Sequence, residues 1–171
     1  QVGGSAHGLD KGGLTSFGRQ VIPRLQEKHM LVDLAHASKP LIDDVLAIST
    51  QPLVVSHTGV AGTCPGPRNL TDEHLRKIAA TGGVIGIGYW DGAVCDPSLA
   101  SIVKAIRYTA DLVGVEHVAL GSDFDGGAGE AGVVRVDEGG DALAGALGMG
   151  VEPLAVPTTG EDLGHQRQGR G

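Results

Sequence analysis

Three side chains that can bind a metal ion or carry a proton stand where short apolar runs of the sequence end. His36 and His57 each close such a run, and Asp123 directly follows a third. In α/β folds the carboxyl ends of parallel strands are where ligands bind, so these side chains are expected to share a site. Two imidazoles with a carboxylate suit zinc or a similar divalent ion. From the residues alone, the alternative stays open that each is a half-buried, hydrogen-bonded side chain of the fold.

Arg68 is a fourth candidate, in the glycine- and proline-rich loop over residues 58–69. This loop follows the run that ends at His57, so we expect it to lie above the strand ends. A guanidinium in that place can hold a carboxylate through two parallel hydrogen bonds. A solvated surface arginine is the alternative.

Other motifs for chemistry are incomplete. Residues 123–126, Asp-Phe-Asp-Gly, are similar to the start of a calcium loop, but Gly127 and Val134 occupy its fifth and twelfth positions, where oxygen ligands are needed. The chain has neither a phosphate-binding G-K-[ST] motif nor a G-x-S-x-G nucleophile motif. Cys64 and Cys95 form no C-x-x-C motif, and we expect two ordinary reduced thiols.

Charge and hydropathy exclude several classes of protein. Lys and Arg number 13 against 20 Asp and Glu, and the net charge of −7 argues against a nucleic-acid surface. No run of 18 apolar residues predicts a transmembrane helix. The chain opens on Gln1 without a signal peptide, which we interpret as a cut end. The compartment therefore stays open, with the cytoplasm expected for a bacterial protein.

The candidate residues need a scaffold of alternating strands and helices. Buried strands are expected over residues 30–36, 52–57, 84–89 and 117–122. Helices are expected over residues 15–29, 38–48, 71–81 and 96–114, with Thr15, Ser38 and Asp96 among their N-caps. This alternation predicts an α/β fold with a parallel sheet, either an open doubly wound sheet or part of a barrel.

The last 44 residues differ from the rest. Residues 128–171 contain 11 of the 29 glycines and no aromatic residue. We expect an irregular, poorly ordered tail there, which divides the chain into two regions, 1–127 and 128–171.

The segments that carry the candidate residues resemble the membrane dipeptidase (renal dipeptidase) family of metallopeptidases, peptidase family M19. The resemblance covers about residues 8–127 and includes the spacing of 21 residues from His36 to His57 and of 11 from His57 to Arg68. The matching segments are residues 13–18, 30–38, 52–57, 67–70 and 121–126.

The resemblance implies a (β/α)₈ barrel of the metal-dependent hydrolase type with two zinc ions, of which this chain would form strands five to eight. It implies that His36 and His57 are ligands of one zinc and that Arg68 binds the carboxylate of the substrate. It also implies that Asp123 faces the metal-bound water and carries its proton to the leaving amine. The implied reaction is hydrolysis of a dipeptide by a hydroxide that bridges the metals.

The family's other ligands are a His-x-Asp pair and a bridging glutamate, and no His-x-Asp occurs in this sequence. We therefore expect an incomplete fragment that is inactive alone. For the complete protein, a homodimer stays open. Two alternatives remain. The chain is a non-catalytic remnant with a partial metal site, or it belongs to a metal-dependent amidohydrolase with another substrate.

Overall fold

The structure is a computed structural model, and it describes residues 1–123. The expected boundary at residue 127 and the expected tail over residues 128–171 lie outside the described residues. None of the helices in the described part of the chain is long and apolar enough to cross a membrane.

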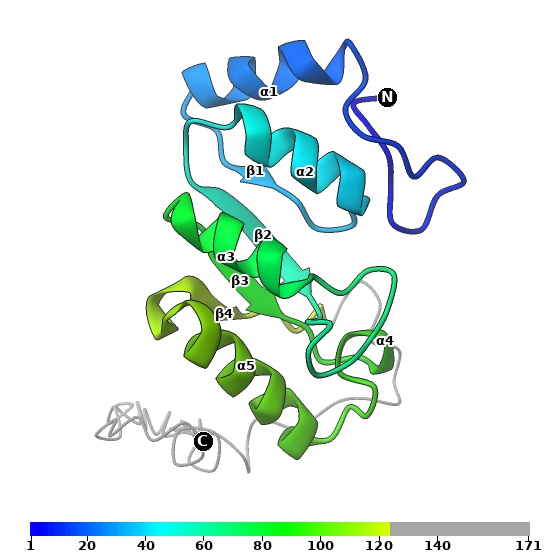
Figure 1. Cartoon of the computed structure of the whole chain (residues 1–171), viewed down its shortest axis with the longest axis vertical. Helices are drawn as coiled ribbons and strands as arrows, with labels where there is room; N and C mark the ends of the chain where they lie inside the picture. Colours follow the sequence, from blue (N-terminus) through cyan, green and yellow to red (C-terminus); the bar gives the residue numbers. More distant parts are fainter. Residues whose placement is uncertain (124–171) are drawn as a thin grey trace, which may run out of the picture.

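Four strands form one parallel sheet in the order β1-β2-β3-β4 (Figure 1). The strands are β1 Val32–Asp33, β2 Leu53–Thr58, β3 Val84–Ile87 and β4 Val118–Leu120. All four expected strands are present, which confirms the parallel α/β sheet, but β1 is much shorter than the apolar run that predicts it. After Leu34 N donates to Val54 O, the Asp33 carboxylate accepts the N–H of Ala35 and turns the chain out of the ladder.

Helices connect the strands. They are α1 Gly18–Glu27, α2 Lys39–Ile48, α3 Asp72–Ala80, α4 Asp91–Val94, α5 Leu99–Val113 and a 3-10 turn over Val115–His117. The sequence predicts four of the α-helices and misses α4, a single turn whose four residues are too few for a periodic pattern.

Helix starts follow local hydrogen bonding. Ser38 caps α2 as expected, its hydroxyl accepting the N–H of Leu41. The hydroxyl of Thr15 accepts the N–H of Gly18, so it satisfies the first turn of α1 although the regular helix begins three residues later. The prediction that Asp96 caps α5 is wrong. Ser98 is the cap, and the Asp96 carboxylate accepts the Ser98 hydroxyl at 2.9 Å instead.

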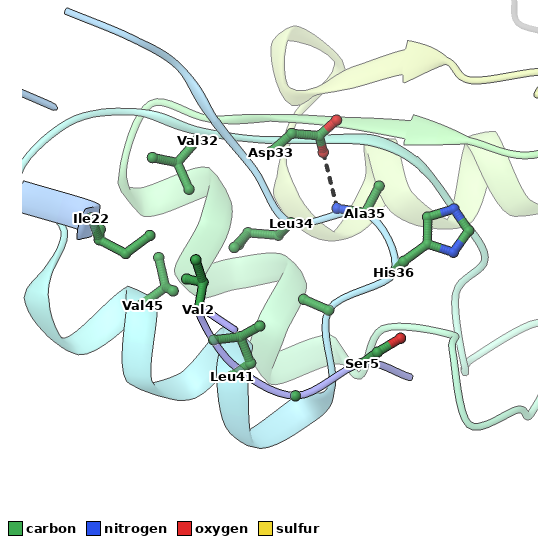
Figure 2. A pocket seen from close by; sticks show the side chains of 12 residues that line it. Val2, Ser5, Ile22, Val32, Asp33, Leu34, Ala35, His36, Leu41 and Val45 are labelled. Carbon is green, nitrogen blue, oxygen red and sulfur yellow. Dashed lines mark hydrogen bonds between the residues drawn. The ribbon is translucent and has the colours of Figure 1, made fainter. Parts of the chain in front are cut away.

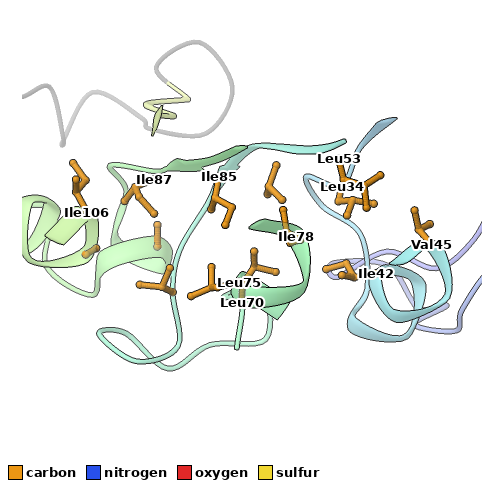
Figure 3. Close-up of a cluster of buried hydrophobic side chains, with 14 of the residues drawn as sticks. Leu34, Ile42, Val45, Leu53, Leu70, Leu75, Ile78, Ile85, Ile87 and Ile106 are labelled. Atoms are coloured by element: carbon orange, nitrogen blue, oxygen red, sulfur yellow. The ribbon is translucent and has the colours of Figure 1, made fainter. Parts of the chain in front are cut away.

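The helices α2, α3 and α5 lie on one face of the sheet, with the core between them and the strands (Figure 3). Right-handed crossovers between strands in sequential order produce this arrangement. The core side chains are almost inaccessible to solvent: Val45, Leu53, Leu75, Ile78 and Ile85 are each exposed by 1% or less. The described strands show no reversal of order, which a doubly wound sheet would need.

Candidate functional site

His36 and His57 meet at the carboxyl end of the sheet. β1 and β2 are parallel neighbours, so their ends lie side by side, and His57 Nε2 is 2.9 Å from His36 Nε2. His36 adopts a left-handed backbone with φ of 61°, and Asp123 another with φ of 57°. For residues other than glycine this conformation costs roughly 1–3 kcal/mol and is concentrated at functional sites.

Asp33 and Ser56 form a hydrogen-bonded chain that leads to the Nδ1 side of His57. Asp33 Oδ1 accepts the N–H of Ala35 at 2.9 Å and that of Ser56 at 3.0 Å. Burial raises the pKa of Asp33, but the hydrogen bonds from Ser56 and Ala35 and the nearby His57 outweigh it and hold the pKa below its usual value. The Ser56 hydroxyl is 2.9 Å from His57 Nδ1, so when Nδ1 donates to it, Nε2 presents its lone pair to the site.

Arg68 reaches the same place from the loop after β2. Its Nη2 lies 3.3 Å from His36 Nε2 and 3.4 Å from His57 O. Its Nε is buried without a hydrogen-bond partner. Burial lowers the pKa of Arg68, and the Asp123 carboxylate opposes that shift. Arg68 is therefore a partly buried cation at the strand ends rather than a solvated surface side chain.

Asp123 comes from the far side of β3. Its Oδ2 lies 3.7 Å from His57 Nε2, although β2 and β4 are not neighbours. Two glycines allow this approach: a Cβ on Gly86 would lie 2.2 Å from the carbonyl oxygen of Ser56, and a Cβ on Gly121 would lie 2.4 Å from the same atom. The backbones of Gly86 and Gly121 therefore lie against that of Ser56, and Asp123 comes within reach of His57. The structure thus gathers all four residues selected from the sequence.

The charge around His36 favours a neutral imidazole. Burial is the largest cause that lowers its pKa, the neighbouring Arg68, His57 and His7 lower it further, and the Asp123 carboxylate opposes them. Arg68 can only donate, so His36 Nε2 meets it with a lone pair. The 2.9 Å contact between the two Nε2 atoms then needs a proton or a cation between them.

These residues fit part of a metal site. Two imidazole nitrogens that converge are typical ligands of one zinc ion. Within residues 1–123, however, no group of three or more His, Cys, Asp or Glu side chains could hold a metal ion by itself. The described residues could therefore supply a pair of ligands but not a complete set.

A cavity of about 260 Å³ lies beside β1 (Figure 2). Its walls are mainly apolar and include Val32, Leu34, Leu41 and Val45. The ring of His36 points away from these side chains in Figure 2. The cavity borders the site at His36, which is among its lining residues, but Arg68 and His57 are not among them.

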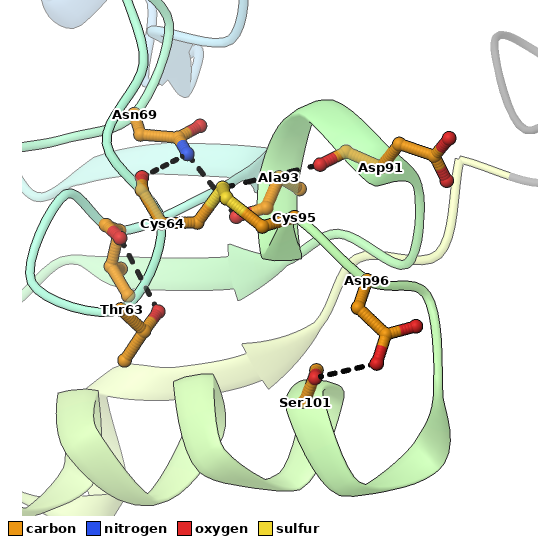
Figure 4. Close-up of a disulfide and its surroundings, with 9 residues drawn as sticks. Thr63, Cys64, Asn69, Asp91, Ala93, Cys95, Asp96 and Ser101 are labelled. Atoms are coloured by element: carbon orange, nitrogen blue, oxygen red, sulfur yellow. Dashed lines mark hydrogen bonds between the residues drawn. A yellow bond between two sulfur atoms is a disulfide. The ribbon is translucent and has the colours of Figure 1, made fainter.

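The expectation of two reduced thiols is wrong. Cys64 and Cys95 form a disulfide (Figure 4), with their Cα atoms 5.5 Å apart. The loop after β2 folds back onto α4, and the spacing of 31 residues gives no signal of that contact. The sequence reasoning also missed Trp90, whose ring lies 4.6 Å from Arg68 Cζ and 5.9 Å from the His57 ring. Trp90 is the only tryptophan of the chain, which is a signal in the sequence, but no neighbouring residue indicates that it lies beside Arg68 and His57.

Comparisons with known proteins agree with this geometry. The family model for membrane dipeptidase (peptidase family M19) matches residues 3–135. A dipeptidase of Clonostachys rogersoniana is 36% identical over 117 residues, which are 67% of this chain and 30% of the relative. An uncharacterized protein of Klebsiella pneumoniae is 38% identical over 121 residues, which are 67% of this chain and 45% of the relative.

Among solved structures, a metallopeptidase from Rhodobacter sphaeroides liganded with a phosphinate mimic of the dipeptide L-Ala-D-Ala has a TM-score of 0.71 at 27% identity. The likeness covers 88% of this chain and 44% of that one. The chain thus spans less than half the length of these three proteins. Since the family model covers most of the sequence, the chain belongs to the membrane dipeptidase family, peptidase family M19.

Proposed function

We propose that this chain is the part of a zinc-dependent dipeptidase that supplies one pair of metal ligands, the carboxylate-binding arginine and the proton-carrying aspartate. The observation that carries the proposal is the convergence of His36, His57, Arg68 and Asp123 at one edge of the sheet. Family membership and the likeness to a metallopeptidase that binds a dipeptide mimic support it.

We further infer that β1 to β4 are strands five to eight of a (β/α)₈ barrel. Two features support this inference: the sequential strand order and the helices on one face. A barrel needs both, because its strands follow one another around a closed sheet with the helices outside. The region over residues 1–127 would be this half of the barrel, and residues 128–171 a separate tail.

His36 and His57 would hold one zinc ion through their Nε2 atoms, with Ser56 orienting His57 from Nδ1. The other ligands of a two-zinc site would come from outside this chain, which contains no His-x-Asp. When bound, the metal supplies a Lewis acid at the scissile carbonyl and makes water a competent nucleophile at neutral pH.

Arg68 would bind the terminal carboxylate of the dipeptide. Its unpaired Nε and its partly buried charge support this role, because a buried guanidinium gains most from a carboxylate that arrives with the substrate. Such a contact also selects for dipeptides, since a longer peptide would have no carboxylate at that position.

Asp123 would accept the proton of the attacking water and return it to the leaving amine. Its carboxylate lies within 3.7 Å of His57 Nε2, at the edge of the same site, which supports this assignment.

Zinc titration calorimetry of the 171-residue chain tests the proposal. We expect zinc binding by the wild-type chain and loss of binding in His36→Ala and His57→Ala. His29→Asn is the matched control, since His29 also has a left-handed backbone that asparagine tolerates, and it lies outside the site. Binding that survives both alanine substitutions would refute the ligand assignment.

Hydrolysis of L-Ala-D-Ala by the same preparation tests incompleteness. We expect no turnover above the zinc-only background, because half of the ligand set is missing. Turnover at an ordinary enzymatic rate would show that the chain is a complete enzyme and would overturn the half-barrel inference.

A further inference from the structure

The loop that carries Arg68 is tied twice to the segment that follows β3 (Figure 4). The first tie is the disulfide between Cys64 and Cys95. The second is the side chain of Asn69, whose Nδ2 donates to the carbonyl oxygens of Cys64 at 2.6 Å and of Ala93 at 3.2 Å. Asn69 is fully buried, so water does not compete for these hydrogen bonds. The loop and the segment consequently form one unit.

Each half of this unit contributes one member of a cation–π pair. Arg68 comes from the loop and Trp90 from the segment, with Cζ 4.6 Å from the ring centroid. Such a contact is worth about 0.5–2 kcal/mol, depending on how far it is desolvated. The same ring lies edge-on to His57 with an interplanar angle of 63°. Trp90 therefore contacts both the proposed carboxylate-binding residue and a proposed metal ligand.

Two glycines make room for this packing. A Cβ on Gly88 would lie 1.9 Å from Cζ3 of Trp90, so the ring rests directly on the backbone there. A Cβ on Gly59 would lie 2.3 Å from the carbonyl oxygen of Ala93 and from Oδ1 of Asn69. The place of Trp90 and the approach of the two segments both depend on backbone without side chains.

No carboxylate among the described residues holds Arg68 in an ion pair. Its side-chain contacts are the two weak hydrogen bonds of Nη2 and the stacking on Trp90. Stacking orients a guanidinium without neutralising it, whereas an internal carboxylate would compete with an incoming one. The cation is thus both oriented and available.

We propose that Trp90 is a positioning residue for Arg68, and that the Cys64–Cys95 disulfide and the Asn69 amide hold it against the guanidinium. The inference rests on the proposed function for the ligand that Arg68 is oriented to bind, a terminal carboxylate. The orientation itself is a property of the 171-residue chain and is measurable without metal or substrate.

Nuclear magnetic resonance of the 171-residue chain tests this proposal. Protons held over an indole ring are shifted upfield, so the Hδ shifts of Arg68 report the stacking. We expect the upfield shift in the wild-type chain, a smaller one in Trp90→Phe and none in Trp90→Leu, which keeps apolar volume without a ring. We also expect it to be lost in Asn69→Ala and in the Cys64→Ser/Cys95→Ser double variant.

Thr109→Ala is the matched control for Asn69→Ala, because Thr109 is also a fully buried polar residue but lies on α5 away from the loop. Circular dichroism checks that each variant is folded. If the double cysteine variant does not fold, reduction of the folded wild-type chain with a phosphine provides the same comparison.

Two results would overturn the proposal. An Arg68 shift that is unchanged in Trp90→Leu would show that the ring does not orient the guanidinium. A shift lost in Trp90→Leu but retained in Asn69→Ala and after removal of the disulfide would show that the cross-links do not hold the pair. Absence of zinc binding or dipeptide hydrolysis would change neither readout, so failure of the proposed function is distinguishable.

Discussion

Histidines at the two ends of the sheet have different surroundings. At the carboxyl end, His36 and His57 turn their Nε2 atoms toward each other and toward Arg68. At the amino end, His117 gives Nδ1 to the carbonyl oxygen of Gly83. In the helix layer, buried His74 gives Nε2 to the Asp43 carboxylate at 3.2 Å.

The difference teaches that the partner of an imidazole separates a structural histidine from a site histidine. Each of the latter two places one ring nitrogen against an oxygen acceptor of the fold and so links two elements: α3 to α2, or the start of β4 to the start of β3. His36 and His57 instead face each other through their Nε2 atoms, and this nitrogen-to-nitrogen contact needs a proton or a cation between the two rings. Substitutions should therefore affect ligand binding at one end and stability at the other.

The largest effect is expected for Arg68 in the full-length enzyme proposed above. Arg68→Met removes the charge-assisted contact with the dipeptide carboxylate, which should weaken binding by about 30-fold or more. Steady-state kinetics should show this as a higher KM. Arg68→Lys should fall between, because lysine keeps the charge without the fork. An amidated dipeptide should be insensitive to the substitution, and equal losses for both substrates would contradict the assignment.

The next effect concerns the support of His57. Asp33→Ala removes the acceptor for the N–H groups of Ala35 and Ser56. It also removes the side-chain hydrogen bond with Ser56, whose hydroxyl lies beside His57 Nδ1. Loss of such a supporting contact typically costs about 10–100-fold in metal affinity, which zinc calorimetry would measure. Asp33→Asn, which keeps one acceptor oxygen, should lose less. Unchanged affinity in Asp33→Ala would mean that His57 is oriented without this support.

Substitution of the histidines away from the site should lower stability alone. His74→Ala breaks the contact with Asp43 and should cost about 1–2 kcal/mol in the free energy of unfolding, and His117→Ala about 1 kcal/mol. Urea denaturation would measure both. Zinc affinity should stay at the wild-type value, and a loss of affinity in either variant would break the distinction between the two groups of histidines.

The smallest effect is a pH dependence. The pKa of Asp33 is lower in the folded chain than its ordinary value of 3.8, so the ionised carboxylate stabilises the fold above that pH. This contribution should disappear as the pH falls from about 4 through the folded-state pKa. Urea denaturation across this range should show a shallower loss for Asp33→Asn than for the wild-type chain. Parallel curves would assign the acid loss to other carboxylates.

Much of the fold could be predicted because it depends on local patterns. The runs that end at His36 and His57 are short and mainly apolar, which indicates buried strands, and hydroxyl residues such as Ser38 mark helix starts. The proximity of the two histidines could be predicted, since neighbouring parallel strands end at the same edge of a sheet. The short helix α4 leaves no periodic signal, so it could not be predicted.

By itself, then, the sequence determined the parallel α/β sheet and the edge where His36, His57, Arg68 and Asp123 meet. Those conclusions follow from periodicity and from the direction of parallel strands, which are properties of short segments. Only the tertiary structure decided that Cys64 pairs with Cys95 and that Trp90 stacks on Arg68. These contacts join loops through packing across the sheet edge, and no regularity within either loop specifies where the other lies.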